Sequence, residues 1–182
     1  MIYNLEFVKP YEHLLRTWKD ILSAAGPVDG AEFFIRKAEA HDALLLDIRD
    51  EQKDTFDRPS LDWAIKAHAW LSMLSPMNYT IFHGEKMLMC ITVMAVSQGV
   101  AEISFLTDVN FVDAPRQVKL PLLRAFHKAL AELPFKRIQA KVKADFTIGR
   151  TFVERMGMSE EGVMRKYGPK DDDYILYALI KE

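Results

Sequence analysis

Hydrophobic and polar residues alternate along much of the chain, most regularly over residues 137–142. There Ile138, Ala140 and Val142 are apolar and the residues between them are polar. A period of two predicts a strand that places one face on a core. Alternating or continuously apolar runs predict further strands at 3–8, 78–82, 87–96, 100–107, 162–167 and 174–180. The segment 83–86, which contains Gly84, favours a hairpin turn, so we expect a fold built on a sheet.

Apolar residues at helical spacing predict the helices. They recur every three or four positions over 11–25, 31–40, 61–74 and 122–133. A further short helix is expected to begin at Asp145 or Thr147 and to end at Gly157, a suitable left-handed residue after a helix. Residues 44–46 either extend the second helix or form a short buried strand, since periodicity does not separate the two. Residues 50–58 and 108–120 are polar or mixed, and we expect loops there.

Composition narrows the class of protein. The chain has 182 residues, of which 49% are hydrophobic and 27% charged, which is typical of one soluble globular domain. A net charge of −2 gives no overall field that would favour nucleic acid or an anionic membrane. No apolar run approaches the roughly 20 residues of a membrane span, and the N-terminus is unlike a secretory signal. One cysteine cannot form an internal disulfide, so a cytoplasmic location is expected.

The segment from Arg137 to Lys181 has a distinctive order of elements. A strand is followed by a short helix that ends in glycine, by the phrase Glu161-Gly162-Val163-Met164-Arg165, by a charged turn and by an apolar strand. This order resembles the C-terminal half of the GNAT superfamily of N-acyltransferases. The strand, proline and amphipathic helix that open the chain are also similar to the start of many GNAT chains.

The resemblance implies a single α/β (α+β) domain over residues 1–182. Its sheet would be twisted, mostly antiparallel and mixed, with six or seven strands flanked by about four helices. Residues 28–76 would form a helical elaboration before the central sheet, where the family builds the wall of its acceptor site.

A cofactor site follows from the same resemblance. In GNAT proteins two adjacent parallel strands splay apart, and the gap admits the pantetheine arm of acetyl-CoA. The strands here would be those around Glu102 and Gln139. Unpaired buried backbone groups are costly, so those of residues 105–107 would bind the pantetheine amides. The contacts that the resemblance implies are Phe105, Leu106, Thr107, Arg116, Gln117, Val118, Lys119, Asp145 and Gly149.

The expected pyrophosphate segment departs from the family pattern. GNAT proteins hold the pyrophosphate on a glycine-bearing loop, where backbone N–H groups at a helix N-terminus point at the anion. The corresponding segment, 114–121, contains no glycine. Arg116 and Lys119 could meet phosphates through their side chains; alternatively they are solvated cations on a loop.

Two residues are candidates for catalysis. Glu102 lies in an Ala-Glu-Ile context similar to that of the general base in histone-type members of the superfamily; alternatively it is a surface carboxylate. The tyrosine that many members use as an acid would fall at Val153, which cannot donate a proton. Tyr167, at the end of a predicted strand, is the candidate acid; alternatively it packs on the sheet.

Two functions are compatible with these residues. One is an acetyl-CoA-dependent N-acetyltransferase, whose partners are acetyl-CoA and an amine acceptor that attacks directly. The other is a catalytically degenerate GNAT-like protein that serves as a structural or binding module in a larger assembly, for example a phage virion, or in a homo-oligomer. The histidines and the single cysteine show no spacing typical of a metal site, so no metal is expected. Neither nucleic acid nor a membrane is expected as a partner.

Overall fold

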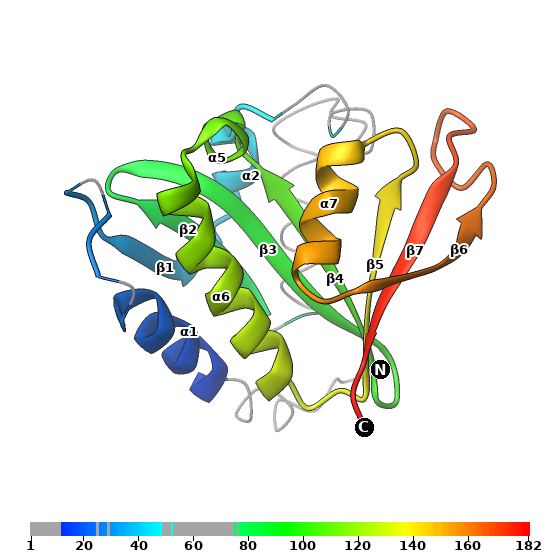
Figure 1. Cartoon of the computed structure of the whole chain (residues 1–182), viewed down its shortest axis with the longest axis horizontal. Coiled ribbons are helices and arrows are strands. Elements are labelled where there is room, and N and C mark those ends of the chain that lie inside the picture. Colours follow the sequence, from blue (N-terminus) through cyan, green and yellow to red (C-terminus); the bar gives the residue numbers. More distant parts are fainter. Residues whose placement is uncertain (1–11, 25, 29, 49–51, 53–74, 76) are drawn as a thin grey trace.

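The computed structural model describes residues 12–24, 26–28, 30–48, 52, 75 and 77–182 (Figure 1). The strand predicted at 3–8, the helix predicted at 61–74 and all but Gln52 of the loop predicted at 50–58 lie outside these residues. The rest of the chain can be compared with the sequence-based expectations element by element.

Seven strands form one sheet in the order β1-β2-β3-β4-β5-β7-β6. The pairing of β4 with β5 is parallel and every other pairing is antiparallel. The predicted α/β fold with a mixed, mostly antiparallel sheet is therefore confirmed. The strands are β1 (Phe33–Lys37), β2 (Met77–His83), β3 (Lys86–Ser97), β4 (Val100–Thr107), β5 (Arg137–Lys143), β6 (Ser159–Met164) and β7 (Tyr174–Ile180).

Helices cover the sheet unequally. α1, α6 and α7 lie in front of one face, and α7 stands between the diverging tips of β4 and β5 (Figure 1). In the part of the chain that the structure describes, no helix is long and apolar enough to cross a membrane. The helices are α1 (Glu12–Ala24), α2 (Asp42–Leu45), α5 (Val109–Asp113), α6 (Arg116–Glu132) and α7 (Thr147–Arg155).

The helix predicted at 31–40 is wrong, because this segment contains the edge strand β1. Phe33 and Ile35 are buried and Phe34 between them is exposed, which is the alternation of a strand. Five consecutive residues pair with β2, so sheet pairing overrides the helical spacing of the apolar residues. Of the two alternatives for residues 44–46, the helical one agrees better with the structure, since the short helix α2 ends at Leu45.

The loop predicted at 108–120 is also wrong, because this segment holds α5 and the first turns of α6. α6 begins at Arg116, directly after Pro115, rather than at Leu122. Val118 is 3% exposed and extends the buried stripe of Leu122 and Ala125 by one turn. Burial of Val118 therefore favours a helix that starts before it. Pro121 lies within this helix and, having no N–H, leaves out one of the backbone hydrogen bonds.

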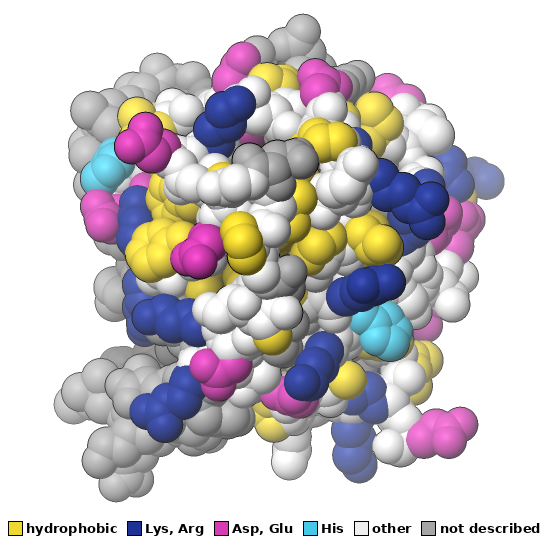
Figure 2. All heavy atoms as spheres, turned by 60° about the vertical axis from the view of Figure 1, so that its left-hand side comes forward, with side chains coloured by type: hydrophobic (Ala, Val, Ile, Leu, Met, Phe, Trp, Pro, Cys, Tyr) yellow, Lys and Arg dark blue, Asp and Glu magenta, His cyan; other side chains and the backbone are white. Residues whose placement is uncertain are grey.

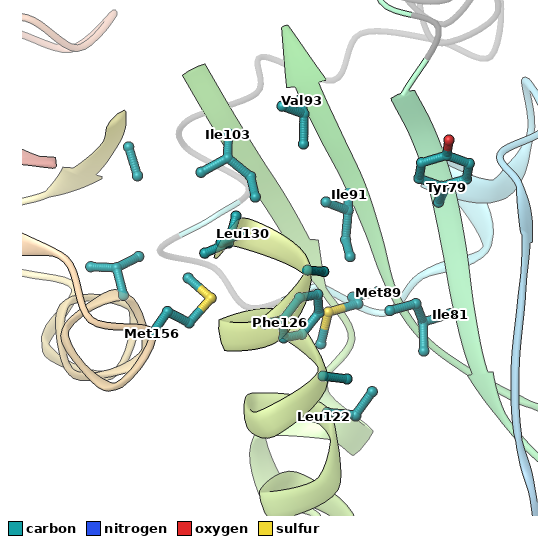
Figure 3. Packing of buried hydrophobic residues seen from close by; sticks show 14 of the residues in the cluster. Tyr79, Ile81, Met89, Ile91, Val93, Ile103, Leu122, Phe126, Leu130 and Met156 are labelled. Atoms are coloured by element: carbon teal, nitrogen blue, oxygen red, sulfur yellow. The ribbon is translucent and has the colours of Figure 1, made fainter. Parts of the chain in front are cut away.

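The main core lies between α6 and the central strands. Leu122, Phe126 and Leu130 project from α6 onto side chains of β2, β3 and β4 (Figure 3). Phe126 is 1% exposed and the two leucines are fully buried. Burial of each such side chain contributes about 1.5–3 kcal/mol, so this interface holds the helix against the strands that frame the site.

The surface carries both signs of charge. On the face shown in Figure 2, acidic and basic side chains are interspersed and neither kind forms a continuous patch. A mixed surface of this kind is typical of soluble proteins and gives no steering field on this face.

A buried carboxylate ties β1 and α2 to the sheet. Both oxygens of Asp42 accept hydrogen bonds from the Arg36 guanidinium, at 2.7 and 2.8 Å, and one also accepts from the Thr80 hydroxyl at 2.5 Å. Burial raises the pKa of Asp42, but hydrogen bonds from Arg36, the Glu39 backbone and Thr80 together lower it more, so the pKa lies below its ordinary value. The ionised pair is thus a structural link rather than a titrating site near neutral pH.

Asp42→Asn is expected to lower the free energy of unfolding by about 1.5–3 kcal/mol at neutral pH, because a neutral amide replaces the charged acceptor of the Arg36 and Thr80 hydrogen bonds. Urea unfolding measures this, with Glu39→Gln as the control, since Glu39 lies 3.4 Å from Arg36 but is mostly exposed. The wild-type advantage should be present above about pH 4, the ordinary pKa of an aspartate, and be lost as the pH falls through the lower folded-state pKa. Equal stability of Asp42→Asn and the control would contradict this role.

Candidate active site

The strands β4 and β5 separate after three paired residues. Pairing joins Val100 to Arg137, Ala101 to Ile138 and Glu102 to Gln139, and it stops there. Both strands continue, β4 to Thr107 and β5 to Lys143, each held by its antiparallel neighbour on the other side. The result is a wedge that opens toward the carboxyl ends of the two strands, as the resemblance to GNAT proteins led us to expect.

A cavity of about 410 Å³ occupies the wedge. Ile103 and Ala140 line it from the face that α6 and α7 cover, whereas Ser104 and Lys141 line it from the opposite face. The cavity therefore reaches both faces of the sheet through the gap between the strands. Side chains that complete the wall come from α5, α6 and α7: Phe111, Val112, Lys119, Leu123, Thr147, Ile148, Gly149, Thr151, Phe152, Val153 and Arg155.

Aromatic rings pack on the helix side of the wedge. The Phe152 ring lies edge-on to Phe105 at 5.3 Å between ring centroids and to Phe111 at 5.6 Å. Phe126 joins the same cluster at 5.6 Å from Phe105. Such edge-to-face contacts add about 0.5–1.5 kcal/mol each beyond burial and keep α7 fixed over the gap.

The charge around the cavity is positive. Lys119, Lys141, Lys143 and Arg155 line it, and no described lining residue is acidic. Carboxylates just outside the lining offset part of this charge, since Lys141 pairs with Glu102 and Lys143 with Asp145 and Asp172. The N-termini of α6 and α7 also lie at the end where the strands diverge (Figure 1), and each brings first-turn N–H groups without partners inside its own helix. This arrangement suits a ligand with an apolar or amide-bearing arm and an anionic end.

The structure brings together some of the predicted cofactor contacts. Phe105, Thr107, Lys119 and Gly149 line the cavity. Arg116 and Gln117 are exposed in the first turn of α6, and Asp145 is exposed before α7. The side chains of Leu106 and Val118 point elsewhere: Leu106 packs with Leu46 and Ile48, and Val118 belongs to the main core.

Gln52, which the sequence did not single out, binds the free edge of β4. Its side-chain nitrogen donates to the Phe105 carbonyl at 3.4 Å. Its side-chain oxygen accepts from the Thr107 N–H at 3.3 Å and from the Thr107 hydroxyl at 2.9 Å. These are backbone groups of the strand segment predicted to bind pantetheine amides.

The two predicted catalytic residues meet at one lysine. Lys141 lies 2.7 Å from a carboxylate oxygen of Glu102 and donates to the Tyr167 hydroxyl at 2.8 Å. Burial lowers the pKa of Lys141, but hydrogen bonds to Glu102 and Tyr167 raise it more, so it lies above its ordinary value. Glu102 sits at the last paired position of the wedge, and Tyr167 is exposed outside the cavity. Of the three, Lys141 alone lines the cavity.

Gly149 and Val153 define the α7 wall. A Cβ at Gly149 would lie 2.3 and 2.5 Å from two ring carbons of Phe146, so the glycine permits close approach of that ring. Val153 is 3% exposed and presents an apolar side chain where the family pattern has a tyrosine. At the position of Val153, α7 therefore offers packing rather than a phenolic proton donor.

No protein-family model and no curated protein sequence matches this chain. Solved structures do match it. One is a GNAT-family acetyltransferase from Bacillus anthracis, with a TM-score of 0.61 at 16% identity, covering 82% of this chain and 96% of that one. Another is an acetyltransferase from Salmonella typhimurium that modifies the N-terminal serine of ribosomal protein L7/L12, with a TM-score of 0.63 at 20% identity, covering 82% and 95%.

A third similar structure is spermidine N-acetyltransferase from Vibrio cholerae in complex with CoA and spermine. Its TM-score is 0.63 at 12% identity, covering 81% of this chain and 95% of that one. With these matches and the splayed β4 and β5, the chain has the GNAT N-acetyltransferase fold, and the resemblance read from the sequence is confirmed at the level of fold.

Gly149→Ala is expected to destabilise the protein by about 1–3 kcal/mol, because the new methyl group overlaps the Phe146 ring. At an ordinary helix position Gly→Ala stabilises the protein by up to about 1 kcal/mol. A loss of stability at Gly149 would therefore itself indicate the overlap with Phe146. Repeating the substitution in a Phe146→Ala background removes the overlap and should cancel most of the cost. Urea unfolding of the four proteins in this cycle measures the coupling, and additive effects would show that the ring does not contact Gly149.

Proposed function

We propose that this protein is an acetyl-CoA-dependent N-acetyltransferase that passes the acetyl group directly to an amine. The observation that carries the proposal is the wedge itself: pairing stops at Glu102 and Gln139 while both strands run on around a cavity that reaches both faces of the sheet. A thin thioester arm can lie between the strands and bond to the β4 edge. The similar spermidine N-acetyltransferase structure, which contains CoA, supports the use of a CoA thioester as the donor.

The surrounding residues have complementary roles in this proposal. Lys119 and the first turns of α6 and α7 hold the anionic end of the donor, since cations and helix N-termini both favour phosphate. The apolar wall of Phe105, Phe152 and Val153 excludes water from the thioester. The acceptor approaches from the face that carries Ser104 and Lys141, because α6 and α7 cover the other.

Transfer needs a base for the attacking amine. Glu102 is proposed for this role: it takes a proton from the acceptor ammonium, the neutral amine attacks the thioester carbonyl, the C–N bond forms, and the C–S bond breaks to release the thiolate of CoA. Tyr167 is proposed to supply the proton that the thiolate takes up, and the attacking nitrogen gives its second proton to the resulting Tyr167 phenolate as the amide forms. Lys141, in contact with both side chains, orients them.

The alternative, a catalytically degenerate binding or structural module, is favoured by two observations. Val153 provides no proton at the usual position of the acid, and Gln52 already bonds to the β4 edge. Under this alternative the fold would be kept without binding of the donor, so the first experiment below separates the two candidates.

Acetyl-CoA is expected to bind and to raise the melting temperature. At 100 times its dissociation constant a ligand stabilises the fold by about 2.7 kcal/mol, a shift of several degrees, which thermal unfolding detects. No shift at millimolar acetyl-CoA would contradict the enzyme proposal and leave the binding or structural module.

The same titration tests the phosphate contact. Lys119→Glu is expected to weaken acetyl-CoA binding about tenfold or more, because it places a negative charge where the donor's anionic end lies. Lys128→Glu, an equal charge reversal at an exposed position further along α6, should leave the affinity near that of the wild type. Equal affinities of the two variants would rule out the contact.

Glu102→Gln is expected to lower the turnover number by about 10²–10⁴-fold, the usual contribution of a general base, with little change in acetyl-CoA affinity. Glu161→Gln is the matched control, since Glu161 also forms an ion pair, with Arg137, and lies outside the cavity. Release of CoA thiol in the presence of an amine acceptor measures turnover. Unchanged turnover in Glu102→Gln would place the base elsewhere.

A further inference from the structure

The hydrogen bonds of Gln52 follow the pattern of a sheet. In a parallel ladder one residue donates its N–H to the carbonyl of residue i−1 on the neighbouring strand and accepts from the N–H of residue i+1. The Gln52 carboxamide does both, to the Phe105 carbonyl and to the Thr107 N–H. It therefore imitates the partner residue that β4 lacks opposite Leu106, where β5 has already turned away.

These hydrogen bonds of Gln52 satisfy backbone groups of β4 that would otherwise be unpaired. Backbone N–H and C=O groups on the free edge of β4 lie beside an apolar cavity, and such groups are costly when unpaired. Gln52 is 8% exposed, so its amide group is itself committed to this edge rather than to solvent.

The two backbone hydrogen bonds are long, however. Donor–acceptor distances of 3.4 and 3.3 Å compare with a typical value of about 2.9–3.0 Å, whereas the bond to the Thr107 hydroxyl, at 2.9 Å, is of normal length. A better-placed amide can replace the side chain at the backbone groups.

From this geometry we infer that Gln52 is an internal competitor of the donor, whose carboxamide occupies the β4 hydrogen-bonding position of a pantetheine amide and has to leave when the donor binds. The inference rests on the proposed function. Gln52 pairs the free edge when no donor is bound, and by competing with amide-bearing ligands it lowers their affinity. Ligands that lack an amide arm do not compete with it.

The test compares three ligands by calorimetry: coenzyme A and pantetheine, which carry the amides, and adenosine 3′,5′-bisphosphate, which does not. Gln52→Ala is expected to lower the dissociation constants of the first two about fivefold, the equivalent of one net hydrogen bond, and to leave that of the third unchanged. Gln98→Ala, the same change in the exposed turn at the other end of β4, should bind all three as the wild type does. Gln52→Met retains the side-chain length without the amide and replaces the alanine variant if that variant fails to fold.

The outcomes separate this inference from the proposed function. If coenzyme A binds the wild type and both Gln52 variants equally well, the donor site stands and the competition does not. Weaker binding by the Gln52 variants makes Gln52 a ligand contact, which also overturns the inference. If coenzyme A binds none of the proteins, both the inference and the proposed function fail.

Discussion

The site depends on one constraint, which is that buried backbone hydrogen-bonding groups need partners. β4 has partners along its whole length on the β3 side, but on the β5 side pairing ends at Glu102. Beyond that point the groups of Phe105 and Thr107 are met by the carboxamide of Gln52. Here a side chain, rather than another strand, pairs with this edge, and the proposed function would have an amide-bearing ligand take its place.

The wedge remains open because each of its strands is fixed by something else. β5 is registered against β7 over its full length, from Arg137 to Lys143, and β4 is registered against β3. Phe152 of α7 packs between Phe105 and Phe111 on the helix side. Closing the gap would break these contacts, so the opening is a property of the packed core and does not need a flexible loop to maintain it.

The sequence predicted the central strands closely. β5 has a period of two that coincides with burial on one face, whereas β3 is a long apolar run that is buried on both faces. It failed at Phe33–Lys37, where adjacent apolar residues satisfy helical spacing equally well and only pairing with β2 decides. In the site, the separation of β4 from β5 followed from the resemblance. The meeting of Glu102, Lys141 and Tyr167 could not be predicted, since it depends on register across three separate segments. Gln52 carries no local signal either: its partners are 53 and 55 residues away in sequence.

The start of α6 bears on how the proposed donor would be held without glycine in residues 114–121. Glycine helps where a loop before a helix has to bring its backbone close to an anion. In this protein the corresponding segment is already helical from Arg116 on. The N–H groups of Val118 and Lys119 both donate to the Pro115 carbonyl. The N–H groups of Arg116 and Gln117 precede them in the first turn, where a helix provides no carbonyl acceptor of its own. Lys119 stands one turn further along, its ammonium bonded to the Val112 carbonyl at the cavity wall. Helix donors and a side-chain charge thus lie at the same end of the wedge, and under the proposed function these groups would meet the anion in place of a glycine loop.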